Sequence, residues 1–385
     1  MLMKAAEVAL GAWMRGRPLT GPLSVQLSIC DACNYRCIMC WDHPPEDRRV
    51  SGMHPSSGAV MDPDMFEGII ADLVRLGTLK VRLIGRGEPT LNPHWLDMIA
   101  LATARGLACD MTTNAARLTP ALAQELADKG LKALTVSLNS ATPETYRLIA
   151  TTCPAGRWEA IVESLKAYCN HRRSGGRPAG VTLSFVISSL NVHEVAAMAD
   201  LARSVKADRL LFQMVQAHPK ATDLLLDEAG RRELAAQGRE LGRWCAERGI
   251  EHNIDFVLKM SEDEARLGTT WSRLVYAVVP CYVGYYFSLI LASGEVLGCC
   301  ACDEPLGNVR DGGFSGVWTS ARYQEYRRDC LTLPQRATPL PKCACFDCGM
   351  ARHNASLGRL LHPLRAARLP SSKAGFRVSQ LWKRF

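Results

Sequence analysis

The sequence lacks the features that mark membrane-spanning, exported and disordered proteins. No apolar run reaches the roughly 18 residues that a helix needs to cross a bilayer. The apolar stretch from Ala5 to Met14 is short and has no small-residue cleavage site, so we expect an amphipathic entry helix rather than a signal peptide. A composition of 48% hydrophobic and 22% charged residues excludes a wholly disordered chain.

Acidic residues are absent from Met350 onward, where the chain has eight Lys or Arg. The net charge is +8, so the rest of the chain is neutral overall, and we expect no nucleic-acid partner. Leucines recur at helical spacing beside arginines in this tail; they are Leu357, Leu360, Leu361 and Leu364, with Arg359, Arg365 and Arg368. The pattern predicts an amphipathic tail that contacts a membrane surface or another anionic partner, or that docks on its own domain.

Cysteine, in contrast, is abundant, with sixteen in 385 residues. Dense disulfides are typical of small secreted domains, whereas a long chain without an export signal is expected in the reducing cytoplasm. In that compartment clustered cysteines bind metal more often than they form disulfides. We therefore expect a cytoplasmic protein with metal sites.

Short β-rich runs alternate with helical patterns, which is typical of βα units and a parallel sheet. The predicted strands are Leu23–Ile29, Lys80–Ile84, Ala108–Thr112, Ala133–Leu138, Val181–Ile187 and Arg209–Val215. Helices are predicted between them at Met65–Leu76, His94–Arg105, Pro120–Lys129, Arg157–Arg172 and His193–Val205. Six strands are too few for a complete eight-stranded barrel, so an α/β fold with a partial (β/α)6 barrel is favoured over an open doubly wound sheet.

Changes of pattern along the chain predict five parts. An entry segment (1–22) precedes the barrel (23–222), which is followed by a helical linker (223–268), a small cysteine-rich domain (269–349) and the basic tail (350–385). The small domain is predicted to contain a β-hairpin, whose strands Tyr285–Leu291 and Glu295–Leu297 join at Ser293-Gly294.

The first cysteine motif is Cys33, Cys37 and Cys40, with the spacing C-x3-C-x2-C directly after the first predicted strand. Three thiolates can hold three irons of a cubane cluster and leave the fourth iron open to a small molecule. A structural zinc site is the alternative, although zinc sites usually have a fourth Cys or His at matching spacing. Cys30 lies at the end of the strand and is expected to be a buried thiol.

The segment from Cys33 to Cys40, CNYRCIMC, resembles the cluster motif of the radical S-adenosylmethionine (radical SAM) superfamily. The resemblance implies that the open iron of a [4Fe–4S] cluster chelates S-adenosylmethionine, and that one-electron reduction releases a 5′-deoxyadenosyl radical. It also implies a reducing partner such as flavodoxin or ferredoxin, and a partial (β/α)6 barrel. Many members have an aromatic residue near the adenine where this chain has Met39.

Three further segments resemble cofactor-binding motifs of the same family. Gly85-Arg86-Gly87-Glu88-Pro89 resembles the GGEP motif, which implies that Gly87, Glu88 and Pro89 receive the cofactor's amino group. Thr113 and Asn114 belong to a turn like the family's TNG, with Ala115 in place of glycine. Ser137 and Asn139 lie in a segment like the one that contacts the ribose and carboxylate, where many members have Asp instead of Asn139.

A second cysteine group consists of Cys281 and Cys299, with Gly294 between them, and Cys345 and Cys348. Four thiolates make a complete ligand set for one cluster or for zinc. The spacing resembles the twitch or shortened SPASM extension of some radical SAM enzymes and implies an auxiliary [4Fe–4S] cluster. The full SPASM spacing, C-x2-C-x5-C-x3-C, is absent, and no role is assigned to the surplus residues Cys30, Cys300, Cys302, Cys330 and Cys343.

These features predict a radical SAM enzyme that abstracts hydrogen from a small polar metabolite of the sugar, aminocyclitol or nucleotide type. The auxiliary cluster would accept an electron or anchor the substrate, so oxidation and redox-neutral outcomes such as epimerisation both stay open. Peptide modification is the close alternative, and a non-enzymatic zinc or electron-transfer protein is the alternative from another class. The sequence assigns no catalytic hydrogen donor.

Overall fold

The structure is a computed structural model that describes residues 2–14, 18–50, 57–174, 180–367 and 369. Its centre is a ten-stranded sheet with the order β10-β9-β8-β1-β2-β3-β4-β5-β6-β7. The strands from β8 through β1 to β7 are parallel, and β9 and β10 are antiparallel to their neighbours. The predicted α/β fold with a partial (β/α)6 barrel is confirmed.

All six predicted barrel strands are present within one to two residues of their expected ends. They are β1 (Ser24–Leu27), β2 (Lys80–Leu83), β3 (Ala108–Thr113), β4 (Ala133–Ser137), β5 (Gly180–Ile187) and β6 (Arg209–Met214). The predicted hairpin is also present as β8 (Phe287–Ile290) and β9 (Glu295–Leu297). Two strands of two residues each, β7 (Glu251–His252) and β10 (Gly307–Asn308), were not predicted.

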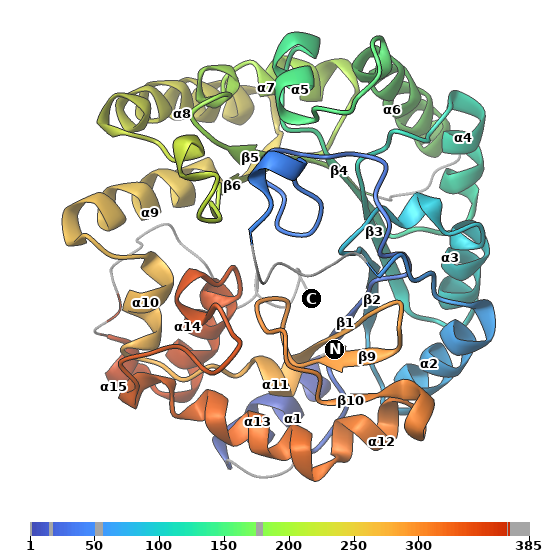
Figure 1. Ribbon diagram of the computed structural model, residues 1–385, viewed down its shortest axis with the longest axis vertical. Coiled ribbons are helices and arrows are strands. Elements are labelled where there is room, and N and C mark those ends of the chain that lie inside the picture. Colours follow the sequence, from blue (N-terminus) through green and yellow to red (C-terminus); the bar gives the residue numbers. More distant parts are fainter. Residues whose placement is uncertain (1, 15–17, 51–56, 175–179, 368, 370–385) are drawn as a thin grey trace.

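Helices surround the sheet on its outer side (Figure 1). Along the barrel they are α2 (Pro63–Arg75), α3 (Trp95–Ala104), α4 (Pro120–Asp128), α5 (Pro143–Ile149), α6 (Arg157–Ser174), α7 (Met198–Ser204), α8 (Glu228–Arg248) and α9 (Ile254–Leu267). Three of them start at a capping side chain followed by proline: Asp62, Thr119 and Thr142 each accept a hydrogen bond from the first turn. This arrangement satisfies otherwise orphaned N–H groups and fixes the three helix starts, of which α4 was predicted at Pro120, α2 two residues late at Met65, and α5 not at all.

The hairpin is part of the barrel sheet, because β8 pairs in parallel with β1 through the register Ser24–Phe287 to Leu27–Ile290. A parallel pairing between segments about 260 residues apart leaves no local trace in the sequence, and we did not predict it. Because of this pairing, the cysteine-rich segment continues the barrel sheet beyond β1.

A second apolar core fills the space beside β8. It involves α1 (Leu2–Trp13), α10 (Trp271–Tyr276), α11 (Val283–Tyr286), α13 (Ala321–Leu331) and α14 (Ala351–Leu361), while α12 (Gly313–Thr319) packs against α2. Arg327 is fully buried here, with its guanidinium over the Trp318 and Tyr323 rings and hydrogen bonds to the carbonyls of Gly284 and Trp318. Burial lowers the pKa of Arg327 to about 10, so it stays charged at neutral pH and is stabilised by the carbonyls and rings.

The beginning of the predicted basic tail is folded as α14 and α15 (Pro363–Ala366). Leu357 is buried in the second core, whereas Leu364 is 90% exposed. The leucines therefore do not form a single exposed face, because the first of them docks on the protein. Arg368 and residues 370–385 lie outside the described residues. Among the described residues, no helix is both long and apolar enough to cross a membrane.

Candidate active site

The predicted cofactor motifs all follow the carboxyl ends of parallel strands. The CNYRCIMC loop comes after β1, the GRGEP turn after β2, Thr113 and Asn114 at the end of β3, and Ser137 and Asn139 at the end of β4. Parallel strands end at the same edge of a sheet, so these segments gather at the mouth of the barrel, where active sites of such barrels lie.

The three cysteines of the first motif lie in a largely desolvated loop. Burial raises the pKa of Cys33 to about 11, and burial together with the neighbouring Cys33 and Cys40 thiols raises the pKa of Cys37. Two backbone N–H groups point at the sulfurs, from Tyr35 to Cys33 (3.5 Å) and from His43 to Cys40 (3.2 Å). N–H donors of this kind stabilise thiolates once metal compensates their charge.

The donor set fits an iron–sulfur cluster by its chemistry, since three thiols of one loop lie near enough to raise one another's pKa. In the described parts of the chain, no three Cys, His, Asp or Glu side chains already stand at metal-binding separations. Cys30 is buried as expected, and burial raises the pKa of its thiol.

The GRGEP turn packs directly on the start of the cysteine loop. A Cβ atom on Gly87 would lie 2.1 Å from the Ala32 carbonyl oxygen, and one on Gly85 would lie 2.8 Å from the Cys30 oxygen. The Glu88 N–H donates to the same Ala32 oxygen at 2.8 Å. The two glycines are thus required by the close approach of two backbones, which brings the second motif into register with the first.

Glu88 is buried at 2% exposure, and its carboxylate joins the turn after β2 to the turn after β3. One oxygen accepts from the Thr90 N–H and from the hydroxyls of Thr90 (2.7 Å) and Thr113 (2.6 Å), and the other accepts from the Asn114 N–H (2.8 Å). Burial raises the pKa of Glu88 despite these donors. The carboxylate organises both loops, and its direct contact with a cofactor ammonium stays a prediction.

Ala115 occupies the position where the resembling family has glycine, and its φ of 58° lies in the left-handed region. The turn is held by the Ala115 N–H, which donates to the Thr113 hydroxyl at 2.9 Å. A side chain in this region is strained by roughly 1 kcal/mol. The turn thus has a left-handed backbone at Ala115 although it lacks a glycine there.

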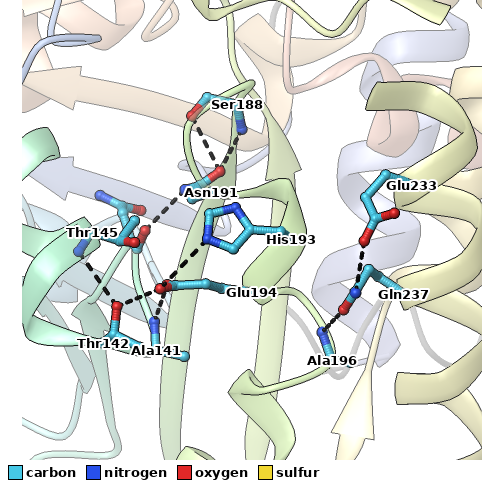
Figure 2. Close-up of polar contacts among 11 residues, drawn as sticks. Ala141, Thr142, Thr145, Ser188, Asn191, His193, Glu194, Ala196, Glu233 and Gln237 are labelled. Carbon is cyan, nitrogen blue, oxygen red and sulfur yellow. Dashed lines mark hydrogen bonds and ion pairs between the residues drawn. The ribbon is translucent and has the colours of Figure 1, made fainter. Parts of the chain in front are cut away.

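Two residues, Glu194 and Asn191, hold the loop after β4 (Figure 2). The sequence did not predict a positioning role for either. The buried Glu194 carboxylate accepts from the Ala141 N–H (2.7 Å) and from the Thr142 hydroxyl. The Asn191 side chain donates to the carbonyl oxygens of Asn139 (2.9 Å) and Val186 (2.8 Å) and accepts from Ser188. Asn191 thereby holds the main chain of Asn139 in place.

The side chain of Asn139 is partly used within the protein, because its oxygen accepts from the Val186 N–H of β5 at 2.8 Å. Its amide NH2 is the group left to face a hydroxyl at the barrel mouth. Ser137 is half-buried beside Ser184 of β5, and Met39 packs against the small apolar cluster that includes Ile38. The cofactor contacts of Ser137, Asn139 and Met39 stay predictions.

The second cysteine group lies in the buried cluster beside the β8–β9 hairpin. Cys281, Cys299, Cys345 and Cys348 are all less than 10% exposed and belong to the second core. The α10 helix holds the Cys345–Cys348 turn, through hydrogen bonds from Ser272 to the Cys348 carbonyl (2.9 Å) and from Tyr276 to the Cys348 sulfur (3.7 Å). Cys299 donates a hydrogen bond to Cys348, which lowers the pKa of Cys348, while burial raises the pKa of Cys281. Four buried thiols with thiolate-stabilising donors fit a metal cluster chemically.

One disulfide, between Cys302 and Cys343, departs from the expectation that the cysteines serve metal sites alone. It joins the loop after Cys299 to the loop before Cys345, and the backbones of these loops also exchange hydrogen bonds between Asp303 and Lys342 and between Ala344 and Ala301. The two cysteines are 41 positions apart, so only the pairing of the two loops brings them together.

Two polar bridges link the cysteine loop of the barrel to the second cysteine group. The Trp41 indole, next to Cys40, donates to the Gln216 carbonyl (2.8 Å), and the Gln216 amide donates to the carbonyl of Asp347 (2.5 Å), which lies between Cys345 and Cys348. The Arg86 guanidinium lies 3.9 Å from Asp42 and donates to Asp303 at 2.9 Å. Gln216 follows β6 as an isolated polar residue, and no pattern in the sequence pointed to this role.

Two family models match the chain. The radical SAM superfamily model covers residues 27–202 and includes the Cys33–Cys40 loop, and the SPASM iron–sulfur cluster-binding domain model covers residues 281–349, from Cys281 to just after Cys348. The chain belongs to the radical SAM superfamily. Membership implies a [4Fe–4S] cluster with S-adenosylmethionine in the first domain of this radical SAM protein and an auxiliary iron–sulfur cluster in its SPASM domain. It also supports an enzyme over the zinc-protein alternative.

The radical SAM protein resembles relatives of different substrate classes. It is 29% identical over 339 residues to the mycofactocin maturase MftC of Mycobacterium tuberculosis, covering 86% of this chain and 78% of MftC. It is 35% identical over 185 residues to GTP 3′,8-cyclase of Acaryochloris marina, covering 46% of this chain and 52% of the cyclase. Among solved structures, Streptococcus suis SuiB bound to the precursor peptide SuiA matches with a TM-score of 0.61 at 14% identity, covering 91% of this chain and 74% of SuiB.

Proposed function

We propose that this radical SAM enzyme is a maturase that modifies a peptide. The observation that carries the proposal is the match to MftC, which covers more than three quarters of each chain. The fold shared with SuiB agrees with it. The proposal reverses our preference from the sequence, where a small polar metabolite was the first choice.

The proposed ligands of the first cluster are Cys33, Cys37 and Cys40, and the cluster bound there would supply the electron that splits S-adenosylmethionine into methionine and a 5′-deoxyadenosyl radical. Around it, the chain's own residues would bind and orient the cofactor. Gly85 and Gly87 let the GRGEP turn lie against the cysteine loop, and Glu88 fixes that turn to Thr113 and Asn114. Asn139, held by Asn191 and Glu194, would present its amide to a ribose hydroxyl.

The proposed ligands of the auxiliary cluster are Cys281, Cys299, Cys345 and Cys348. An auxiliary cluster bound there would supply an electron acceptor. A peptide C–H bond that gave its hydrogen atom to the 5′-deoxyadenosyl radical would then also give up one electron to that acceptor and one proton to solvent, so the peptide would lose two hydrogens and gain a new bond or double bond. The Gln216 and Arg86 bridges hold the two cysteine sites in a fixed relation for this transfer.

The proposal is tested with the reconstituted protein under anaerobic conditions. Peptides encoded beside the gene are incubated with protein, S-adenosylmethionine and a reductant such as flavodoxin. A peptide that loses two hydrogens, with one 5′-deoxyadenosine formed per modification, supports the proposal. The Cys37→Ala variant is the control and should form neither product. Turnover of a nucleotide or sugar, with no change in any peptide, would overturn the proposal.

A small polar metabolite is the second candidate, because the match to GTP 3′,8-cyclase has the higher identity over the stretch that it covers. That match covers 52% of the cyclase, so it leaves nearly half of that enzyme without a counterpart in the alignment. GTP, aminocyclitols and nucleotide sugars belong in the same assay as the peptides. Deuterium transferred from a labelled metabolite into 5′-deoxyadenosine would favour this candidate.

A peripheral contact with an anionic membrane is proposed for the two ends of the chain. The tail supplies the positive charge, and the apolar side chains Met3, Trp13 and Met14 of the entry segment are each more than half exposed, as is Leu364 of α15. Vesicles with and without anionic lipid are pelleted with the full chain and with a chain ending at Ala367. Equal pelleting of both chains would contradict a role of the tail. We also propose a cytoplasmic location, because the cysteine-rich metal sites require a reducing compartment.

A further inference from the structure

Asn354 contacts the second cysteine group although it is not a cysteine. It is on α14, it has no exposed surface, and its side chain makes four hydrogen bonds. The Nδ2 group lies 3.5 Å from the sulfur of Cys281, 2.9 Å from the Tyr276 hydroxyl and 3.2 Å from the Met350 carbonyl oxygen. The Oδ1 atom accepts from the Tyr282 N–H at 2.7 Å.

The orientation of this amide is determined by its partners. The Tyr282 N–H can only donate, so the amide atom facing it has to be the oxygen. The NH2 group is consequently turned toward the Cys281 sulfur and toward Tyr276, whose own hydroxyl donates to the Cys348 sulfur at 3.7 Å. Asn354 and Tyr276 therefore form one donor network that reaches two of the four proposed ligands.

The position of Asn354 in the sequence agrees with this placement. It follows Cys348 by six residues, which is the place of the third cysteine in the spacing C-x2-C-x5-C-x3-C. The chain thus has a neutral hydrogen-bond donor where the longer spacing would have a thiolate. Packing alone does not require an amide there, since an apolar side chain of similar size would fill a buried helix position without needing four partners.

We propose that Asn354 is a positioning residue that raises the reduction potential of the auxiliary cluster by donating a hydrogen bond to the Cys281 sulfur. The proposal rests on the proposed function, because the Cys281 thiol stands in for an iron-bound thiolate. Reduction adds negative charge to a cluster and its sulfurs, and an N–H donor stabilises that charge in a buried site. A higher potential makes the cluster a better electron acceptor, so Asn354 favours the oxidative outcome over a redox-neutral one.

The experiment is a redox titration of the full chain, reconstituted with iron and sulfide and followed by electron paramagnetic resonance. Asn354→Leu removes the donor and keeps the bulk, and Tyr276→Phe removes the second donor of the network. Ser356→Ala is the matched control, because Ser356 is buried on the same helix and its hydroxyl bonds only to the Arg352 carbonyl. The first cluster is an internal reference in every sample.

We expect both Asn354→Leu and Tyr276→Phe to lower the midpoint potential of the auxiliary cluster, while Ser356→Ala and the first cluster stay unchanged. An unchanged auxiliary potential in Asn354→Leu overturns the inference. Loss of the auxiliary iron in Asn354→Leu, when Ser356→Ala retains it, also overturns it and makes Asn354 part of the ligand cage. A wild-type protein with only one cluster instead refutes the proposed auxiliary site, and iron counting separates that failure from the others.

Discussion

The Arg86 guanidinium donates to the Asp303 carboxylate at 2.9 Å, which ties the GRGEP turn of the barrel to the loop that follows Cys302. Arg86 lies between the two glycines of the turn, and its side chain is 18% exposed. Asp303 is 44% exposed, so water screens part of the attraction. The pair therefore acts mainly as a geometric link between the two cysteine sites.

Breaking this link should slow turnover of the substrate more than cleavage of S-adenosylmethionine. We expect Arg86→Ala and Asp303→Asn each to reduce substrate turnover about two-fold, which corresponds to a coupling of about 0.5 kcal/mol. A double-mutant cycle measures the coupling. The exposed Arg322–Glu304 pair in the same region is the control, because it does not reach the barrel. Additive effects of the two variants would contradict a link.

Removing the Glu194 carboxylate should loosen the loop that carries Asn139. Glu194→Ala leaves the Ala141 N–H and the Thr142 hydroxyl without their acceptor, which should lower the free energy of unfolding by about 1–3 kcal/mol in a buried site. We also expect weaker binding of S-adenosylmethionine, measured by calorimetry beside urea unfolding. His193→Ala is the matched control, since the His193 side chain is 59% exposed and its Nε2 atom lies 4.0 Å from Glu194 Oε1, too far for a hydrogen bond. Equal effects of the two variants would show that the carboxylate has no special role.

Glycine at position 115 should be tolerated unusually well. Ala115→Gly relieves a left-handed alanine but gives up a buried methyl group, so we expect a net change within about 1 kcal/mol. Ala116→Gly, at the next buried position without positive φ, should be destabilised by about 1 kcal/mol. Urea unfolding of both variants measures the difference. A larger loss for Ala115→Gly than for Ala116→Gly would contradict the strained geometry.

The stability contributed by Glu88 should fall as pH rises. Burial raises the pKa of Glu88 in the folded state, so the unfolded state releases this proton first as pH rises. The free energy of unfolding therefore decreases above the unfolded pKa of about 4.3. Compared with Glu88→Gln, the wild type should lose stability from that pH upward until the folded pKa is passed. Urea unfolding at a series of pH values gives the difference. A difference that grows with pH would mean that the four donors outweigh burial.

The sequence predicted the barrel well because its signals are local. Each strand from β1 to β6 is a short β-rich run, and each cofactor motif lies at or directly after the end of such a run. Proline and a capping side chain mark the starts of α2, α4 and α5, yet α5 was not predicted, since its seven residues are too few for a helical period to stand out.

Relations between distant segments could not be predicted in the same way. The parallel pairing of β8 with β1, the Cys302–Cys343 disulfide and the Gln216 bridge each depend on how separate loops fold onto one sheet. Asn354 was missed for another reason. The cluster motifs consist of cysteines, and a single buried asparagine has no distinguishing pattern in a sequence. The cofactor contacts of Glu88 and Asn139 stay predictions, because protein donors already occupy most of their acceptors.

The central claim is that the first three cysteines start the radical chemistry and the second four complete it. The most direct measurement is 5′-deoxyadenosine formation by reconstituted Cys37→Ala and Cys345→Ala, each compared with the wild type. The account predicts no 5′-deoxyadenosine from Cys37→Ala, and 5′-deoxyadenosine without modified substrate from Cys345→Ala. Deoxyadenosine formed by Cys37→Ala, or full substrate turnover by Cys345→Ala, would contradict it.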